Sequence, residues 1–310
     1  MKIFACVCLT EAQLFRLRSS VEDTEVTYFP DPAADPAARS AFDESEVVFG
    51  NPPANWIGPP AKTRWIQLES VGFGEYAGLD RSTLENTPIM TNLAGFFSEP
   101  VAESILAGIL SHYRGLGRLR SLQDKRMWNG DPLRTKLTTL LGATIVLIGR
   151  GDINRRVAEL LAPFACHITA FGRGFSLPRL ESAISSADVV ICCVPHSPET
   201  RGLFDAKLFG KLKPGALFVN FGRGSLIGEA ALADALEAGK LGGAVIDVTQ
   251  DEPLGADHRF WAAPNLLLTQ HTGGGTGDEI DRKIDVLLDN LGRYRRREPL
   301  HHQIDFNRGY

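Results

Sequence analysis

The sequence predicts an α/β protein with two doubly wound domains, each built around a parallel sheet. Short apolar runs rich in β-branched residues recur along the 310 residues and alternate with segments of helical periodicity. The clearest run, 143–148, shows no alternation of polar and apolar residues, as expected of a strand buried on both faces. The chain length suits about two domains.

The composition is that of an ordinary globular protein with a sizeable core, since 44% of the residues are hydrophobic and 23% are charged. A net charge of −4 gives no electrostatic reason to expect nucleic acid or an anionic membrane as a partner. No run approaches the ~20 apolar residues of a membrane span. The five cysteines have no disulfide-like spacing, which favours reduced thiols in a cytoplasmic protein.

The N-terminal part of the chain predicts a short helix at 11–18 and four strands, at 2–9, 26–29, 46–50 and 64–68. The first strand is expected in place of a signal peptide, because Glu11 follows the apolar stretch at once and no small-residue cleavage site is present. In a parallel sheet, the loops at the strand C-termini bind small ligands. The loop at 70–74 contains two glycines whose N–H groups could bind a carboxylate, with a simple turn as the alternative.

A long helix is predicted over 98–122, because Ser98, Glu99 and Pro100 are typical of a helix start. Apolar residues follow along one side of it, and its length and position make it a domain connector. The segment 123–139 is polar and is expected to be irregular and exposed.

The segment 140–161 predicts a strand, a glycine turn and a helix. This arrangement aims main-chain N–H groups and a helix N-terminus at a pyrophosphate. The turn and the first helical residues are the candidates for cofactor binding: Gly149, Arg150, Gly151, Asp152 and Ile153. Asn154 occupies the place of the third glycine of G-x-G-x-x-G, which normally lets helix and strand pack closely. Taken alone, the turn either binds a dinucleotide or is an ordinary strand–helix corner.

An arginine follows the next predicted strand, 167–171. About 20 residues past the glycines, an acidic residue would bind the ribose hydroxyls of NAD, but the chain has Gly172, Arg173 and Gly174 there. A guanidinium group suits the 2′-phosphate of NADP, because it forms paired hydrogen bonds with it. The sequence therefore favours NADP(H), with NAD(H) possible and a solvated surface arginine as the alternative.

Arg223, Glu252 and His271 follow three successive predicted strands, which cover 216–220, 244–248 and 266–270. Because the C-terminal ends of parallel strands share one edge of the sheet, the three side chains can converge. Arginine can bind a carboxylate, histidine can donate a proton near neutral pH, and glutamate can stabilise and orient the protonated ring. These roles suit the reduction of a 2-oxo acid by a hydride donor. Taken singly, the histidine could only cap a loop and the glutamate could lie on the surface.

The sequence predicts no metal site and no catalytic nucleophile. His258, His301 and His302 lack ligand-like spacing to other histidines or to cysteines. No G-x-S-x-G or comparable nucleophile motif is present.

Together these features resemble the D-isomer-specific 2-hydroxyacid dehydrogenase family over nearly the whole chain. The segments that carry the resemblance are IGRGDIN, ADVVICCVPHSPETRGLF, KPGALFVNFGRGSLIGEAAL, GGAVIDVTQDEPL and LLLTQHTGG. The chain also resembles the glyoxylate and hydroxypyruvate reductases of that family, in part through GNPPANW, RWIQLESVGFG and IDFNRGY. The resemblance implies reduction of a small 2-oxo acid of this type to the D-2-hydroxy acid, by hydride transfer from NAD(P)H.

The resemblance also implies roles for individual residues. Arg223, Glu252 and His271 are the implied catalytic trio, and Arg223 binds the substrate together with the N–H groups of Val71 and Gly72. The remaining implied cofactor contacts fall on Pro195, Ser197, Thr200, Phe221, Asp247 and Gly274. Among these, the aspartate and the main chain at the phenylalanine would bind the nicotinamide carboxamide.

The implied organisation has two Rossmann-like domains. One is a flavodoxin-like substrate domain, 1–97 with 283–310, and the other is a dinucleotide-binding domain, 98–282. The long helix that begins at Ser98 would help to form a homodimer. The C-terminal helix would return to the first domain.

Three departures from the family pattern bear on the site. Asn154 replaces the third glycine, Gln270 stands where proline usually precedes the histidine, and Gly172–Arg173 replaces the acidic residue that binds NAD. The first two departures bear on cofactor affinity and on the position of His271, and the third shifts the preference toward NADP.

Two other functions stay open at this point. A dinucleotide-sensing regulatory protein could keep the same fold, although sensing needs no proton donor. Formate oxidation is disfavoured, because formate dehydrogenases of this fold differ around the histidine and carry longer N-terminal domains. Four aromatic residues could line the substrate pocket or occupy ordinary core positions: Trp56, Phe73, Phe96 and Phe97.

Overall fold

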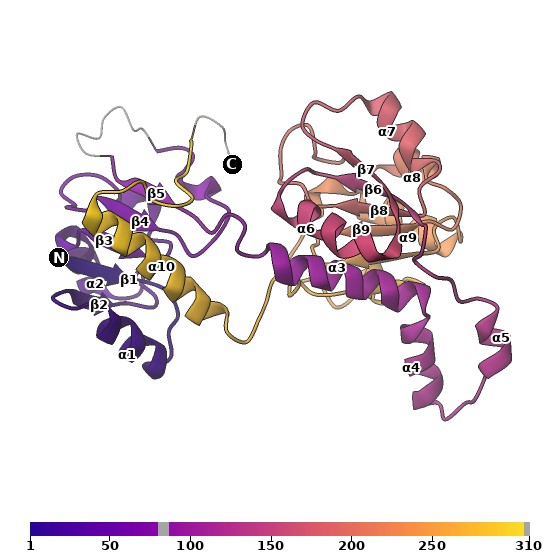
Figure 1. The fold of residues 1–310 in the computed structure, drawn as a ribbon, viewed down its shortest axis with the longest axis horizontal. Coiled ribbons are helices and arrows are strands. Elements are labelled where there is room, and N and C mark those ends of the chain that lie inside the picture. The colour runs from indigo at the N-terminus through magenta and orange to yellow at the C-terminus, as the bar shows by residue number, and fades with distance from the viewer. Residues whose placement is uncertain (80–86, 307–310) are drawn as a thin grey trace. The chain divides into compact units, whose positions relative to one another are not determined.

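The structure is a computed structural model that describes residues 1–79 and 87–306. Its chain forms two compact units, Met1–Phe96 with Thr276–Tyr310, and Phe97–Gly275 (Figure 1). From the sequence we expect the chain to pass between the two domains after residue 97 and again after residue 282. In the structure the second passage lies earlier, after Gly275, because the whole C-terminal helix packs in the core of the first unit. The last four residues of the segment IDFNRGY lie outside the described residues.

A five-stranded parallel sheet organises the first unit, in the order β2-β1-β3-β4-β5. Its strands are β1 (Lys2–Ala5), β2 (Glu25–Tyr28), β3 (Val47–Phe49), β4 (Trp65–Gln67) and β5 (Ile89–Thr91). This is the flavodoxin-like strand order. Helices cover both faces, with α1 (Glu11–Ser20) and α10 (Glu279–Arg296) on one core and α2 (Pro36–Glu44) on the other.

The central strands β1 and β3 of this sheet carry apolar residues in succession because both faces of the sheet are covered. Ile3 and Ala5 of β1 lie in the core with α1 and α10, whereas Phe4 lies in the core with α2. Successive side chains of a strand point to opposite faces, so all three of these residues have to be apolar.

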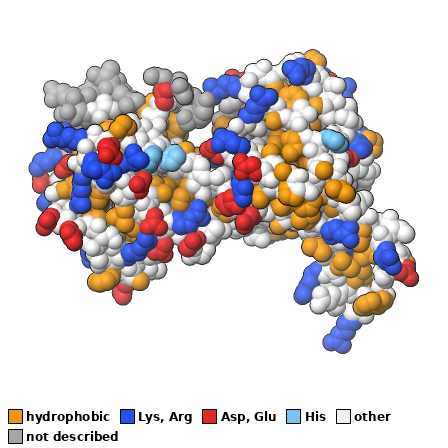
Figure 2. All heavy atoms as spheres, in the orientation of Figure 1, with side chains coloured by type: hydrophobic (Ala, Val, Ile, Leu, Met, Phe, Trp, Pro, Cys, Tyr) orange, Lys and Arg blue, Asp and Glu red, His pale blue; other side chains and the backbone are white. Residues whose placement is uncertain are grey.

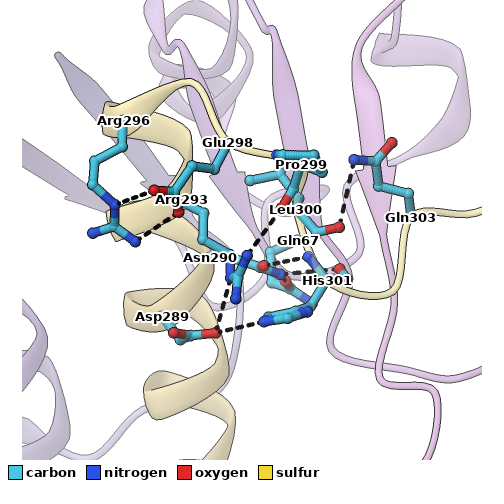
Figure 3. A network of polar contacts seen from close by, with 10 residues as sticks. All are labelled: Gln67, Asp289, Asn290, Arg293, Arg296, Glu298, Pro299, Leu300, His301 and Gln303. Atoms are coloured by element: carbon cyan, nitrogen blue, oxygen red, sulfur yellow. Dashed lines mark hydrogen bonds and ion pairs between the residues drawn. The ribbon is translucent and has the colours of Figure 1, made fainter.

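A buried polar network ties the C-terminal segment to the sheet of the first unit (Figure 3). Asn290 of α10 donates through Nδ2 to Gln67 Oε1 at 3.0 Å and to His301 O at 3.2 Å. Its Oδ1 accepts from His301 N–H at 2.8 Å, and Thr91 Oγ1 donates to the same Gln67 oxygen at 2.8 Å. Both amides are hydrogen-bonded, as burial of polar groups requires, so α10, β4 and the C-terminal segment are held together.

A six-stranded parallel sheet organises the second unit, in the order β11-β10-β9-β8-β6-β7. Its strands are β6 (Thr144–Ile148), β7 (His167–Phe171), β8 (Val189–Cys192), β9 (Leu217–Asn220), β10 (Gly243–Ile246) and β11 (Leu266–Leu268). The strand order reverses at β6, which pairs with β7 on one side and with β8 on the other. In open parallel sheets, ligands bind at the strand C-termini beside such a reversal.

Helices cover both faces of this sheet as well. One face carries α3 (Ser98–Tyr113) and α6 (Asp152–Leu161), and the other carries α7 (Leu177–Ile184), α8 (Ala206–Lys211) and α9 (Glu229–Glu237). The helix α3 lies very close to the sheet, since a Cβ on Gly108 would lie only 2.7 Å from Val245 Cγ1. Within residues 1–79 and 87–306, no helix is both long enough and apolar enough to span a bilayer.

The single helix predicted over 98–122 is in fact two helices. The helix α3 ends at Tyr113, and α4 (Leu116–Asp124) begins after Gly115, whose φ of 64° is incompatible with a continuous helix. Helical periodicity continues across this glycine, which is why the sequence predicts one helix. The prediction of an irregular segment at 123–139 is also wrong in part, because it contains α5 (Gly130–Arg134). Figure 1 shows α4 and α5 projecting from the rest of the second unit.

Candidate active site

The turn between β6 and α6 has the geometry that a dinucleotide phosphate needs. Gly149 has a φ of 109°, and a Cβ there would lie 2.5 Å from Cys193 O, so only glycine fits. Gly151 is the N-cap of α6, and a Cβ built on it would have no neighbour within 4 Å. The first N–H groups of a helix have no partner within the helix and attract anions. The residues present therefore fit a pyrophosphate.

Two arginines lie at the C-terminal end of β7. The guanidinium group of Arg150 donates to Ala170 O at 2.9 Å and so covers the end of the strand. Arg173 follows the strand and is exposed. The pKa of Glu199 is lowered, chiefly by the hydrogen bond from Ser197 and also by the positive charge of Arg173. This end of the sheet thus carries two guanidinium groups that a phosphate could contact.

Pro195, Ser197 and Thr200 form one compact turn after β8. Thr200 Oγ1 donates to Pro195 O at 2.8 Å and accepts from Ser197 N–H at 2.9 Å. The turn is linked to the loop after β9, because His196 Nδ1 lies 2.7 Å from Ser225 Oγ. The structure therefore brings these three predicted cofactor residues together at the strand ends.

Arg223 lies in a rigid turn after β9. Asn220, which is fully buried, accepts from Gly222 N–H at 3.1 Å and donates to Arg223 O at 3.1 Å. The next residue has to be glycine, since a Cβ on Gly224 would lie 2.0 Å from the carbonyl of Thr249. The loops after β9 and β10 therefore pack directly on each other and fix the main chain at Arg223.

Glu252 and His271 form a close pair. His271 Nδ1 lies 2.6 Å from Glu252 Oε2, and Glu252 Oε1 accepts from Thr249 N–H at 3.0 Å. Burial raises the pKa of Glu252, but these hydrogen bonds and the positive charges of His271 and Arg223 outweigh it, so the pKa lies below its ordinary value. An ionised carboxylate only accepts, so Nδ1 carries the hydrogen and Nε2 is free to exchange a proton with a ligand. Gly224, the residue after Arg223, packs on Thr249, whose N–H binds Glu252, so the turn of Arg223 lies against the loop that carries the Glu252–His271 pair.

Asp247 anchors the loop that carries His271. Its Oδ1 accepts from Thr269 Oγ1 at 2.5 Å and from Gly273 N–H at 3.1 Å, and its main-chain carbonyl accepts from His271 N–H at 2.6 Å. Phe221 packs against the same loop, since a Cβ on Gly273 would lie 2.5 Å from Phe221 Cε1. The two residues predicted to bind the nicotinamide carboxamide therefore also support the histidine.

The glycines after His271 pack against the N-terminal part of α3. Ser104 Oγ donates to Gly273 O at 3.0 Å, and a Cβ on Gly274 would lie 2.9 Å from Phe97 Cδ1. Phe97, a candidate for the substrate pocket, thus packs against this loop and the core of the second unit.

Gln270 and His271 both have left-handed backbone conformations, with φ of 53° and 56°. Residues with a Cβ rarely adopt this region, because it is sterically strained. Proline cannot adopt it at all, because its ring fixes φ near about −65°. The departure at Gln270 from the family pattern is therefore required by the backbone of this loop.

The loop after β4 is braced so that its N–H groups face outward. Leu93 N–H donates to Ser70 O at 3.1 Å, and Asn92 Nδ2 donates to Val71 O at 2.8 Å. In a trans peptide the carbonyl and the following N–H point in opposite directions. The N–H groups of Val71 and Gly72 therefore point away from the residues that hold the loop, and both residues are exposed.

The other candidate aromatics of the first unit have different surroundings. Phe73 is buried beside Phe306, with ring centroids 5.4 Å apart, and Trp56 packs on the core that α2 covers. Phe73 is therefore a core residue, and Trp56 is partly buried against the core. The ring of Phe96 lies under the guanidinium group of Arg282 at 4.5 Å, and Arg282 also donates to Phe96 O at 3.1 Å.

The polar residues that support the site are not apparent from sequence reasoning. Asn220 and Thr269 hold the turns of Arg223 and His271, and Asn154 donates to two carbonyls at the glycine turn. None of the three has a titratable side chain, so chemistry alone does not single them out. For Asn220 and Thr269 the available signal is a polar residue at the end of an apolar strand, whereas Asn154 stands out in the sequence only as the residue in place of the third glycine.

Two of the other histidines, for which the sequence predicts no metal binding, lie beside carboxylates. His258 Nε2 lies 3.3 Å from Glu229 Oε2, and His301 Nε2 lies 3.5 Å from Asp289 Oδ2 (Figure 3). Among the described residues, no group of three or more His, Cys, Asp or Glu side chains is arranged to hold a metal ion.

Comparison with known proteins identifies the family. Residues 106–273 match the family model described as D-isomer specific 2-hydroxyacid dehydrogenase, NAD binding domain. A solved structure of such a family protein from Aeromonas salmonicida is 27% identical, with a TM-score of 0.82 over 98% of this chain and 99% of that one. An uncharacterized protein of Corynebacterium melassecola is 27% identical over 86% of this chain and 90% of that protein. The chain belongs to the D-isomer-specific 2-hydroxyacid dehydrogenase family, and the predicted fold class is confirmed.

Relatives with named activities differ in their reactions. Formate dehydrogenase of Arabidopsis thaliana is 33% identical over 63% of this chain and 54% of that protein. Glyoxylate/hydroxypyruvate reductase A of Yersinia enterocolitica is 28% identical over 67% of this chain and 68% of that protein. An NADPH-dependent glyoxylate/hydroxypyruvate reductase of Sinorhizobium meliloti, solved with NADP and sulfate, has a TM-score of 0.79 at 21% identity, over 100% of this chain and 99% of that one. The family makes this protein an NAD(P)-dependent oxidoreductase of the 2-hydroxyacid dehydrogenase type.

Replacing Gln270 by proline, as the family pattern would have it, should damage the site. Proline cannot adopt the φ of 53° that places His271 beside Glu252, so Gln270→Pro should lose about 2 kcal/mol or more of unfolding free energy and should lower kcat. Gln270→Gly should keep kcat, because glycine adopts this conformation freely. Denaturant unfolding and steady-state kinetics measure the two effects.

Asn265→Pro is the matched control. Asn265 precedes the strand that leads to Gln270 and is also left-handed, with a φ of 56°. Proline there should lower stability in a similar way while kcat, measured well below the melting temperature, is retained. A Gln270→Pro variant as stable and as active as the wild type would contradict the backbone described for this loop.

Proposed function

We propose that this protein reduces a small 2-oxo acid of the glyoxylate or hydroxypyruvate type to the D-2-hydroxy acid, with NADPH as the hydride donor. The observation that carries the proposal is the Glu252–His271 pair, 2.6 Å apart and close enough to Arg223 for its charge to act on Glu252. A proton donor, a carboxylate that supports it and a guanidinium group are the protein groups that this reduction needs.

Each of the three residues has one part in the reaction. A dinucleotide held at the glycine turn would supply the hydride for the carbonyl carbon of the substrate. Arg223 binds the carboxylate and polarises the carbonyl oxygen, while His271 gives a proton to that oxygen as it becomes an alkoxide. Glu252 stabilises the protonated ring through Nδ1–H. One hydride and one proton thus convert the carbonyl into the hydroxyl of the 2-hydroxy acid, and His271 acts as the base in the reverse direction.

The loop after β4 is proposed to bind the carboxylate of the substrate. The N–H groups of Val71 and Gly72 point away from the residues that brace the loop, Leu93 and Asn92, and two such groups suit a carboxylate. Named relatives support a small 2-oxo acid, since the Yersinia enterocolitica and Sinorhizobium meliloti proteins are glyoxylate/hydroxypyruvate reductases.

The preference for NADPH rests on the end of β7. Arg173 stands where NAD enzymes carry an acidic residue, and Arg150 lies over the same strand end. A dinucleotide-sensing regulatory protein is the alternative function. Sensing would use the glycine turn but would have no need of the Glu252–His271 pair, so the pair favours catalysis.

Initial rates of NADPH and NADH oxidation with glyoxylate, hydroxypyruvate and pyruvate test the proposal. We expect faster oxidation of NADPH with at least one of these acids. Arg173→Ala should raise KM for NADPH about tenfold and leave that for NADH unchanged, because only NADPH has the 2′-phosphate. Arg179→Ala, an exposed arginine of α7, is the control. A preference for NADH would remove Arg173 from the site, and dinucleotide binding without turnover would favour sensing.

His271→Asn should separate chemistry from binding. Loss of the proton donor should lower kcat by about 100-fold or more, while the Kd for NADPH, measured by fluorescence titration, stays near the wild-type value. His258→Asn, which removes an ion pair with Glu229, should keep kcat. Unchanged turnover in His271→Asn would contradict the assignment of the proton donor.

We also propose a homodimer formed through the arm, residues 116–134, that contains α4 and α5. Large apolar side chains are exposed on and beside the arm: Leu116, Leu119, Met127, Trp128 and Leu141. Figure 2 shows apolar side chains on this projection. A groove of about 1000 Å³ lies between the arm, the end of α3 and the edge of the sheet. Exposed apolar groups of this kind mark interfaces, and a second copy of the chain is the proposed partner.

Sedimentation equilibrium tests the homodimer. The wild type should sediment as a dimer, and Trp128→Asp should shift it to a monomer, because the fully exposed indole would be buried by the partner. Phe15→Asp removes an equally apolar exposed side chain from the first unit and should leave the dimer intact. A monomeric wild type, or a dimer unaffected by Trp128→Asp, would contradict the proposal.

A further inference from the structure

Asn154, in the first turn of α6, is almost fully buried beneath the glycine turn, with 2% of its surface exposed. Its Nδ2 donates to Ile148 O at 3.0 Å and to Gly149 O at 2.9 Å. The first carbonyl ends β6 and the second opens the turn. One side chain therefore ties the start of α6 to the end of the strand before it.

The orientation of this amide is fixed by its partners. Two carbonyl oxygens need a donor, so the nitrogen has to face them and the oxygen has to face the other way. Among the described residues, Asn154 Oδ1 is buried and has no hydrogen-bond partner. The free energy lost by burying an unpaired acceptor offsets what the two hydrogen bonds gain. Asn154 therefore acts mainly by fixing the direction of the two carbonyls, and it adds little to the free energy of unfolding.

The direction of these carbonyls decides where the neighbouring N–H groups point. In each planar trans peptide, the N–H lies opposite the carbonyl. Gly149 N–H accordingly points to β7, where it donates to Phe171 O at 2.8 Å. Because Asn154 holds Gly149 O, the N–H of Arg150 points to the opposite side of the turn, away from Asn154.

We propose that Asn154 is a positioning residue for the pyrophosphate of the dinucleotide. It fixes the turn in the conformation that presents main-chain N–H groups, a task that close packing on a third glycine performs in the usual motif. A Cβ on Gly149 would lie 3.1 Å from Asn154 Nδ2, so the side chain packs directly on the turn. Glycine at 154 would leave a gap there and remove the donor that holds Gly149 O. Restoring the motif should therefore weaken binding.

The inference rests on NAD(P) binding by this family and is tested by titration of the whole chain. Asn154→Gly and Asn154→Ala should each raise the Kd for NADPH about tenfold, measured by calorimetry. The alanine variant removes the amide and keeps a good helix former, so its melting temperature should stay close to that of the wild type. Adenosine 2′-monophosphate has no pyrophosphate, and its Kd should be the same in all three proteins.

Kinetics give a second readout. KM for NADPH should rise in both variants, while kcat at saturating NADPH and KM for the oxo acid stay unchanged, because Asn154 touches neither Arg223 nor His271. Val157→Ala is the matched control, since Val157 lies one turn further along α6 and is buried in the core. It should lower the melting temperature and leave the Kd for NADPH unchanged.

Three results would overturn the inference. Asn154→Gly could bind NADPH as tightly as the wild type or more tightly, which would make Asn154 a defect in the glycine motif. Asn154→Ala could lose affinity only in proportion to a loss of stability, as a purely structural residue would. A wild type that binds neither NADPH nor NADH would overturn NAD(P) binding itself. If the glycine variant fails to fold, the alanine variant and the adenosine 2′-monophosphate titration decide the question.

Discussion

Buried amide side chains that donate to main-chain carbonyls hold the functional loops of both units. Asn92 binds Val71 O in the first unit, and Asn154 and Asn220 bind carbonyls after β6 and β9 in the second. Because peptides are planar, a carbonyl held on one side displays the next N–H on the other. The loops that would contact anions thus rest on neutral donors, which add no charge of their own and shift no nearby pKa by a Coulomb effect.

The histidine loop is held in a different way, by a carboxylate. Asp247 accepts hydrogen bonds from Thr269 and Gly273 and offers its main-chain carbonyl to His271. Strained backbone persists only where its surroundings hold it firmly, and Gln270 and His271 meet this condition. The position of the imidazole therefore depends on two acidic residues. Asp247 fixes the main chain of the loop, and Glu252 holds the ring at Nδ1.

Much of the fold and part of the site follow from the sequence. Apolar runs locate the strands because both sheets are covered on both faces, and the order of residues after successive strands brings Arg223, Glu252 and His271 together. The break at Gly115 is not apparent, because a single glycine inside a periodic segment is compatible with a continuous helix. The left-handed backbone at Gln270 cannot be predicted from composition or from periodicity. The sequence reveals Asn154 only as a departure from the glycine motif, because its hydrogen bonds depend on three-dimensional packing.

The cysteine whose main-chain carbonyl faces Gly149 has a thiol of low reactivity. Burial raises the pKa of the Cys193 thiol and that of its neighbour Cys192, and it raises the pKa of Cys6 to about 12. Thiolates are the species that alkylating agents and peroxides attack, so the raised pKa values lower the reactivity of these thiols. Cys8 is exposed instead. It offers a selective handle for attaching a spectroscopic label to the first unit of the native enzyme.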